Sequence, residues 1–149
     1  MFTGTYEFEV VPDDGYLVAV PYELEGGTQG KDFDELCEMV ADWLRLDIET
    51  HEIEGRPMPR ATFGHEPRYG GSNVVFSVTA GRETCDRVSA SEAARELGVT
   101  PGRVTQMVGA GLLVGWREGR NSYVTRASVE ARRAEAPAAG RPRRQAVDA

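Results

Sequence analysis

Two side chains in the second half of the chain have the types and the spacing that read base pairs in DNA. Arg103 and Gln106 lie three residues apart, so both would project from the same side of a helix. Arginine pairs bidentately with guanine in the major groove, and glutamine pairs with adenine. The sequence therefore predicts a DNA-contacting surface made of Thr100, Gly102, Arg103, Thr105 and Gln106.

Two short helices joined at Gly98 are predicted around these residues. Ser89 or Ser91 can cap the first helix, and Thr100 can cap the second, with Pro101 at its first position. The inward positions have helix-turn-helix spacing: Ala93, Ala94, Leu97, Val99, Val104 and Met107. Any two short helices that cross at a corner share part of this spacing, and the outward Arg and Gln favour DNA binding.

A β-hairpin is predicted after the second helix. Leu112 to Trp116 and Ser122 to Thr125 have the apolar character of strands, and a charged, glycine-bearing turn separates them. A third helix is expected to start at Thr125 or Ser128 and to run through Arg133. Polar groups at the hairpin turn can reach phosphates or the minor groove, namely Arg117, Arg120 and Asn121.

Acidic side chains gather on one side of a helix predicted in the first half. Asp32 can cap this helix, and Glu35 completes a capping-box pattern. Apolar residues recur at three- and four-residue spacing on the inner side: Phe33, Leu36, Cys37, Val40, Trp43, Leu44 and Ile48. The opposite side carries Asp34, Glu35, Glu38, Asp42 and Glu49. This side is either a solvated surface or a contact surface for a basic protein.

Other carboxylates suggest metal-dependent nuclease chemistry as a further alternative. Divalent cations in nucleases are held by carboxylate oxygens, and the available groups are Asp13, Asp14, Glu23 and Asp32. They fall mainly at turns and at a helix cap, where acidic side chains have a local structural role. We therefore predict that the protein is not an enzyme and has no catalytic residues, no metal site and no cofactor.

Strands are predicted on both sides of the acidic helix, and the order β-β-β-α-loop-β indicates a small α+β unit. Alternation over Thr5 to Val11 places Tyr6, Phe8 and Val10 on the core face, with Glu7 and Glu9 on the opposite face. A turn is predicted at Pro12 to Gly15. The remaining segments are strands at Tyr16 to Tyr22, Thr28 to Gly30 and Asn73 to Thr79, and a Pro- and Gly-rich loop at Gly55 to Gly71.

Charge divides the chain into two parts. Residues 1–80 hold 16 acidic and 5 basic side chains, whereas residues 81–149 hold 8 acidic and 12 basic ones. An acidic half joined to a basic half indicates two domains with different partners. We predict domains at 1–80 and 87–133, a linker at 81–86, and a disordered tail at 134–149. The tail is basic through Arg141, Arg143 and Arg144.

Several classes of protein are excluded by composition. No apolar run approaches the roughly 18 residues that cross a bilayer. The first residues, MFTGTYEFEV, lack a basic stretch followed by an apolar one, as a secretory signal would have. The cysteines, Cys37 and Cys85, are too few for a disulfide framework. We expect a cytoplasmic protein.

The first half resembles the HicB-type antitoxins over roughly residues 5–80. The resemblance rests on GYLVAVPYELEGGTQGKDFDELCEMVADWLRLDIE, the later PMPRAT stretch and the closing strand. The chain departs from the family at Gly26 and Gly27, where a Gly-Cys pair is common. The resemblance implies a partial RNase H-like fold, usually without nuclease activity, that binds and neutralises a small basic RNA-cleaving toxin.

The second half is similar to excisionase-like and MerR-like winged helix-turn-helix domains over residues 87–133. The similarity rests on the Gly-Leu-Leu helix end, the charged REGRN turn and the tyrosine of the returning strand. It covers only the DNA-binding part of those families. HicB-type antitoxins commonly end in a ribbon-helix-helix or in another helix-turn-helix, so this pairing of domains is less usual.

Together these features predict a type II antitoxin that also represses its own operon. The expected partners are operator DNA and a small basic toxin. A single small reading head makes few base contacts, so we also expect a homodimer or higher homo-oligomer, joined at a sheet edge of the first domain. The alternatives are a phage- or plasmid-type regulator whose first domain dimerises or senses a ligand, and an acidic-cluster nuclease.

Overall fold

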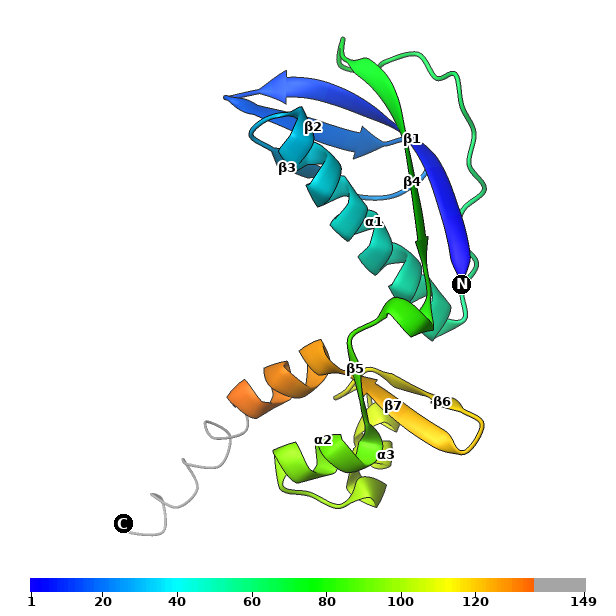
Figure 1. The fold of residues 1–149 in the computed structure, drawn as a ribbon, viewed down its shortest axis with the longest axis vertical. Helices are drawn as coiled ribbons and strands as arrows, with labels where there is room; N and C mark the ends of the chain where they lie inside the picture. The colour runs from blue at the N-terminus through cyan, green and yellow to red at the C-terminus, as the bar shows by residue number, and fades with distance from the viewer. Residues whose placement is uncertain (136–149) are drawn as a thin grey trace, which may run out of the picture. The chain divides into compact units, whose positions relative to one another are not determined.

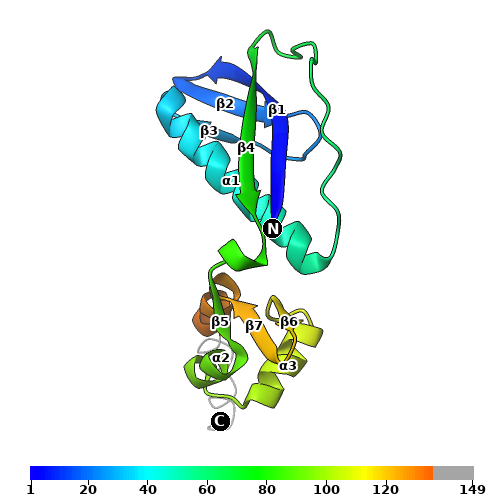
Figure 2. The ribbon, with the colours of Figure 1, turned by 45° about the vertical axis from the view of Figure 1, so that its right-hand side comes forward.

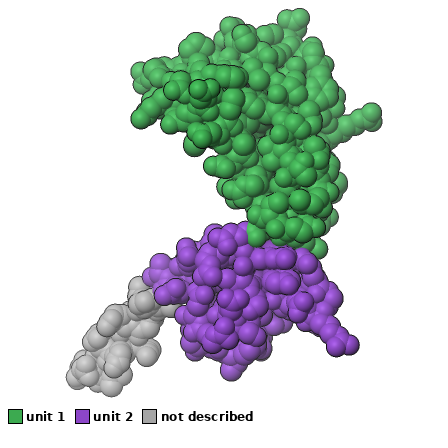
Figure 3. All heavy atoms as spheres, viewed as in Figure 1, with its two compact units in different colours: residues 1–85 green, residues 86–149 purple. Residues whose placement is uncertain are grey.

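The computed structural model describes residues 1–135 and has mixed α+β architecture with two antiparallel sheets. It consists of two compact units, Met1–Cys85 and a second unit that begins at Asp86 (Figures 1 and 3). Each unit has its own hydrophobic core. The predicted α+β class is confirmed.

The sheet of the first unit has the strand order β3-β2-β1-β4. Its strands are β1 (Phe2–Asp13), β2 (Tyr16–Pro21), β3 (Thr28–Gly30) and β4 (Ser72–Ala80), and every neighbouring pair is antiparallel. The predicted four-residue turn tightens to Asp14 and Gly15, which both have positive φ angles. An Asp-Gly pair favours such a two-residue hairpin because its twist matches that of the flanking strands. Pro12 and Asp13 therefore join the ladder.

Helix α1 (Phe33–Glu54) covers one face of this sheet (Figure 1). The Asp32 side chain accepts the Glu35 N–H at 2.8 Å, which confirms the predicted cap. The fully buried side chains between helix and sheet are Tyr6, Phe8, Ala19, Leu36, Val40, Leu44 and Ile48. Phe33 was predicted on the inner side, but it is 46% exposed because it occupies the first helical position, at the margin of the core.

The second unit contains β5 (Arg87–Ser89), α2 (Ala90–Leu97), α3 (Pro101–Gly109), β6 (Gly115–Glu118) and β7 (Asn121–Thr125). Residues 126–135 form a further helix. The strands pair in the order β5-β7-β6. The core joins both short helices, the sheet and this last helix through Val88, Ala93, Ala94, Val104, Met107, Leu113, Val124 and Val129.

Several predicted boundaries in this unit are corrected. Strand β5 was not predicted, and β6 begins at Gly115 because the N–H groups of Leu112 and Leu113 bond to the Met107 carbonyl at the end of α3. Ala134 and Glu135 belong to a helix rather than to the predicted tail. The rest of that tail, 136–149 with its arginines, lies outside the described residues.

The predicted linker at 81–86 also contains structure. A short 3₁₀ helix, η1 (Arg82–Thr84), occupies its centre, and Cys85 ends the first unit. The hydroxyl of Thr84 donates to Glu49 Oε2 at 2.6 Å, so η1 is held against the end of α1. The segment is therefore part of the first unit as far as Cys85.

Glu7 and Glu9 lie on the face of β1 away from α1, as alternation predicts, yet that face is not solvated there. Glu9 is fully buried and Glu7 is 7% exposed. Residues 56–71, an irregular segment, run alongside β1 from the end of α1 to the start of β4 (Figure 2). This segment covers both carboxylates, which accept hydrogen bonds from its His65 and Tyr69 N–H groups. Alternation therefore assigned the face correctly but did not show that it is covered, because the covering segment comes from far along the chain.

The loop is attached to the sheet by hydrogen bonds to these carboxylates. Glu9 accepts the backbone N–H groups of Arg68, Tyr69 and Gly71 at 2.7–2.8 Å. Glu7 accepts the N–H of His65 at 2.9 Å and contacts its ring Nδ1 at 2.6 Å. A buried carboxylate requires such partners, since its desolvation is otherwise unfavourable.

The pKa values of both carboxylates fall below the ordinary value of 4.5. For Glu9, burial alone would raise the pKa, but the N–H groups of the loop and the charge of Arg68 outweigh it. For Glu7, the hydrogen bond from the His65 N–H and the bond from the His65 ring lower the pKa. Both groups therefore contribute stability when they are ionised, and this contribution is lost as the pH falls below about 4.5.

We predict that Glu9→Gln detaches the loop. The amide NH₂ group of glutamine cannot accept hydrogen bonds from the backbone N–H groups that Glu9 binds, so the loop should open more often. Trypsin should then cleave the variant after Arg60 and Arg68 several-fold faster than it cleaves the wild type. The stability difference between the two proteins should begin to shrink as the pH falls below 4.5, the ordinary pKa of the carboxyl, and should vanish once the pH has passed the lowered pKa of Glu9 in the folded protein. Glu38→Gln, at an exposed helical site, is the matched control. Equal cleavage in the variant and the control would contradict this role.

Candidate nucleic-acid interface

Helix α3 is positioned by a short turn and two local capping features. Gly98 ends α2 in the left-handed conformation, with φ 68°, which glycine adopts without strain. The hydroxyl oxygen of Thr100 then accepts the Arg103 N–H at 3.1 Å, and Pro101 occupies the first turn. These features set the start of α3 and therefore decide which of its side chains face outward.

The outward side of α3 carries the predicted DNA-contacting residues. Val104 and Met107 are buried in the core of the unit, whereas Gly102, Arg103, Thr105 and Gln106 are exposed. Arg103 Nη1 lies 3.5 Å from Gln106 Oε1, so the two side chains lie close together on this surface. The spacing prediction and the observed exposure agree for these residues.

A hollow of about 420 Å³ lies beside this surface. It is lined by the beginnings of α2 and α3 and by the start of β7, with Ser89, Ala90, Ser91, Pro101, Gly102, Thr105, Arg120, Asn121, Ser122 and Tyr123. Helix beginnings carry partial positive charge and exposed N–H groups. Together with Arg120, they make this hollow suited to a phosphate group.

The hairpin β6–β7 presents the remaining predicted residues. Its turn uses Gly119, with φ 59°, and Arg120 and Asn121 line the hollow. Arg117 is exposed, and its Nε donates to the Gly119 carbonyl at 3.0 Å, so its side chain lies along the turn. The structure thus brings Arg120 and Asn121 next to the start of α3, with Arg117 at the turn itself.

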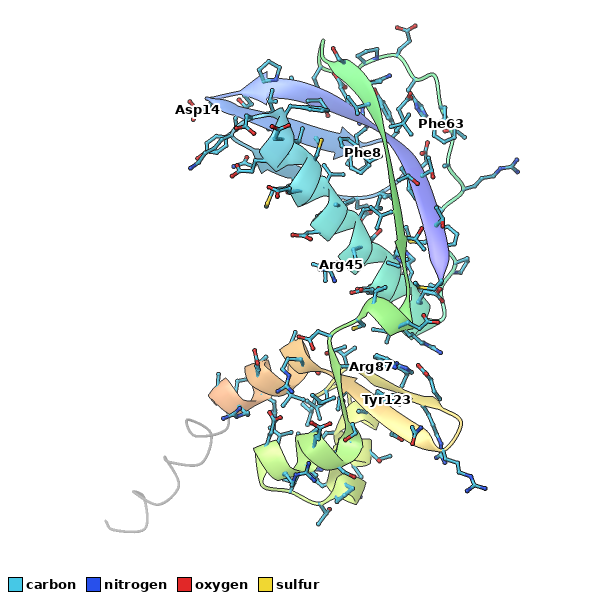
Figure 4. The ribbon with its side chains drawn as sticks, in the orientation of Figure 1. Phe8, Asp14, Arg45, Phe63, Arg87 and Tyr123 are labelled. Atoms are coloured by element: carbon cyan, nitrogen blue, oxygen red, sulfur yellow. The ribbon has the colours of Figure 1, made fainter. Side chains whose placement is uncertain are left out.

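Arg87 was not predicted as part of this site, yet it supports the hairpin. Its guanidinium lies 4.1 Å from the ring centre of Tyr123 and 3.0 Å from Glu118 Oε2 (Figure 4). Trp116 Nε1 donates to the same Glu118 oxygen at 2.7 Å. A cation stacked on an aromatic ring is attracted to the ring, and here the Glu118 carboxylate also holds the guanidinium. These contacts stabilise the pairing of β5, β7 and β6. The strand that carries Arg87 is too short to give a periodic sequence signal.

The acidic side of α1 is smaller than predicted. Asp34, Glu38 and Asp42 are exposed at four-residue spacing. Glu35 accepts the Lys31 N–H at 2.6 Å and so belongs to the helix start. Glu49 is only 3% exposed and binds Arg45 and Thr84, so its assignment to a partner surface is wrong. The helix turns Glu49 toward η1, which sequence periodicity does not show.

The carboxylates considered for a nuclease do not converge. Asp14 lies at the end of the β1–β2 hairpin (Figure 4), and Asp32 caps α1. Glu23 accepts the hydroxyl of Thr62 and lies 3.1 Å from His65 Nε2. Within residues 1–135, no group of three or more His, Cys, Asp or Glu side chains is arranged to hold a metal ion.

Comparison of the chain with known protein families, with curated proteins and with solved structures finds no match. None of the helices in the described part of the chain has the length and apolar character needed to span a membrane.

We predict that Thr100→Ala destabilises the second unit by about 1 kcal/mol, because the first turn of α3 loses a partner for the Arg103 N–H. Thr100→Asp should restore most of the loss, since Asp caps equally well. Chemical denaturation followed by circular dichroism measures this. Thr105→Ala, an exposed change on the same helix, is the control, and an equal loss there would contradict the capping role.

Proposed function

We propose that residues 87–133 form a winged helix-turn-helix domain that binds double-stranded DNA. The observation that carries the proposal is the exposed Arg103 and Gln106 pair on α3, the helix whose Val104 and Met107 are buried in the core. In this proposal α3 enters the major groove and reads bases, and the β6–β7 hairpin is the wing. Arg120 and the helix beginnings then contact phosphates, which position the domain without reading sequence.

The small residues of α3 support a close approach to DNA. Gly102 and Gly109 are exposed and have no side chain to hold the helix away from the groove. Thr105 is exposed one residue before Gln106, and its hydroxyl can contact either a base edge or a phosphate. The excess of basic residues in the second half supplies the attraction to the DNA backbone.

We further propose that two copies bind one operator, which lies at the protein's own promoter. One α3 reaches only a few base pairs, whereas useful specificity requires more contacts. Two reading helices related by a two-fold axis would recognise two half-sites about one helical turn apart, or a multiple of that. The operator is therefore expected to be approximately palindromic.

We predict that Arg103→Ala and Gln106→Ala each weaken operator binding by about 1–3 kcal/mol and relax the sequence preference at one base pair of each half-site. Arg120→Ala should weaken binding on all sequences alike and reduce the slope of the salt dependence by about one. Fluorescence anisotropy with a promoter duplex, at several salt concentrations, measures both effects.

Arg60→Ala removes the same charge from an exposed site in the first unit and is the matched control. The Arg60→Ala variant should bind the promoter duplex with the affinity of the wild type. If Arg103→Ala and Gln106→Ala leave affinity and base preference unchanged, α3 is not the recognition helix. If Arg120→Ala changes base preference rather than salt dependence, the assignment of the wing is wrong.

For the first unit, we propose binding of a small basic RNA-cleaving toxin, as its resemblance to HicB-type antitoxins implies. The observation that favours this is the exposed Asp34, Glu38 and Asp42 row on α1. Arg45 lies on the same helix, and it pairs with Asp42 at 3.8 Å and with Glu49 at 3.3 Å. Such a row attracts a basic partner and steers its approach.

We predict that the triple variant D34N/E38Q/D42N loses co-purification with the small basic protein encoded next to this chain. The difference from the wild type should be largest at low salt and shrink at high salt, because salt screens the electrostatic attraction. The variant D13N/D14N/E66Q removes the same charge elsewhere on the unit and should retain the partner. If both triple variants behave alike, the α1 row is not the contact surface. The absence of a basic neighbour that binds would contradict the antitoxin role.

A further inference from the structure

The first unit has one long sheet edge. The sheet ends at β3, which has 3 residues, and at β4, which has 9. Within residues 1–135, no strand pairs with the outer edge of β4. A strand edge of this length presents a row of backbone donors and acceptors to which another strand can add.

The backbone groups on that edge can be identified from the register. Tyr22 N–H donates to the Glu7 carbonyl, so Glu7 directs its backbone groups toward β2. Backbone direction alternates along a strand, so Tyr6 and Phe8 direct theirs toward β4, where they pair with Phe76 and Val74. The alternate residues of β4 must therefore direct their N–H and C=O groups away from the sheet: Asn73, Val75, Ser77 and Thr79.

This strand also lacks the usual protection against pairing. Exposed edges are normally guarded by charged side chains, prolines or bulges. The β4 sequence SNVVFSVTA contains no charged residue and no proline, and Val75 is 50% exposed. The rest of the unit is strongly acidic, since residues 1–80 contain 16 acidic and 5 basic side chains.

The charge distribution identifies the occupant as a second copy of the chain. A basic partner would gain most from the acidic α1 row, not from an uncharged strand. A second acidic copy meets least repulsion along an edge strand without charged side chains, and β4 is the longer of the two edge strands and has none. An antiparallel strand that pairs with itself is also related to its copy by a two-fold axis, as a closed dimer requires.

We propose that β4 pairs antiparallel with β4 of a second copy, with the two-fold axis at Phe76. This register places Val75 opposite the partner's Ser77, and Asn73 opposite the partner's Thr79. It uses every outward-directed residue of β4 and joins both sheets into one. The functional role of this dimer rests on the proposed function, in which two copies bind one operator. The pairing of β4 identifies the surface that joins those two copies.

Ser77→Pro tests the pairing. Because the Ser77 N–H is directed away from β1, proline removes a bond to the second copy and leaves the β1–β4 ladder intact. Ser77→Ala is the matched control, since it also loses the 2.8 Å contact with the Thr5 hydroxyl but keeps the N–H. Light scattering should give a molecular mass of twice 16.3 kDa, that of a dimer, for the wild type and the control. For Ser77→Pro it should give the monomer mass of 16.3 kDa.

Amide hydrogen exchange on the wild-type chain provides a second measurement that needs no variant. The amides of Val75, Ser77 and Thr79 should exchange slowly at concentrations where the protein is a dimer and faster on dilution. A wild-type monomer, a Ser77→Pro dimer, or a dimer whose edge amides exchange freely would overturn the proposal. If Ser77→Pro does not fold, the exchange result alone decides.

These measurements are made without DNA, so they separate the two proposals. A β4-paired dimer with no affinity for the promoter would support the pairing and contradict the DNA-binding function. A monomer that binds a half-site, and whose affinity for it falls in Arg103→Ala, would support the DNA-binding function and contradict the pairing. If both proposals are correct, the Ser77→Pro variant should bind a single half-site with the affinity of the wild type. It should lose the higher affinity that the wild type has for an operator with two half-sites.

Discussion

The first unit depends on the buried carboxylate of Glu9. Helix α1 ends at the opposite end of the sheet from the point where β4 must begin, so the chain has to return along the length of β1. Glu9 fixes this return by accepting three backbone N–H groups from the loop. Those bonds satisfy the carboxylate, which would otherwise be buried without partners. The direction of β4, and with it the free edge of the sheet, follows from this attachment.

In the second unit, local capping takes the place of a buried anchor. Ser89, Gly98 and Thr100 begin or end the short helices by bonds to neighbouring backbone groups. These helices are too short to be stable alone, and a core shared with the strands and the last helix holds them. The outward position of Arg103 and Gln106 is therefore set by two requirements that agree, the cap at Thr100 and the burial of Val104 and Met107.

The two units divide their chemistry by charge. The first is acidic but has a long uncharged strand, β4, at one edge of its sheet, while the second is basic around the start of α3. Such a division suits a protein that meets a basic protein and an acidic polymer with separate surfaces. It also explains how two copies of an acidic unit can approach each other, because the repulsion is lowest where no charged side chain lies.

The sequence by itself determined the α-helices of both units, the presence of a turn between β1 and β2, and the outward residues of α3. These depend on caps, turn residues and periodicity, whose physical causes act within a few residues. Tertiary structure alone decided the burial of Glu9 and Glu49, the support of the hairpin by Arg87, and the place of β4 at the sheet edge. Each of these joins groups that lie far apart in the chain, and no local pattern records which distant backbone group a carboxylate or a strand edge will meet.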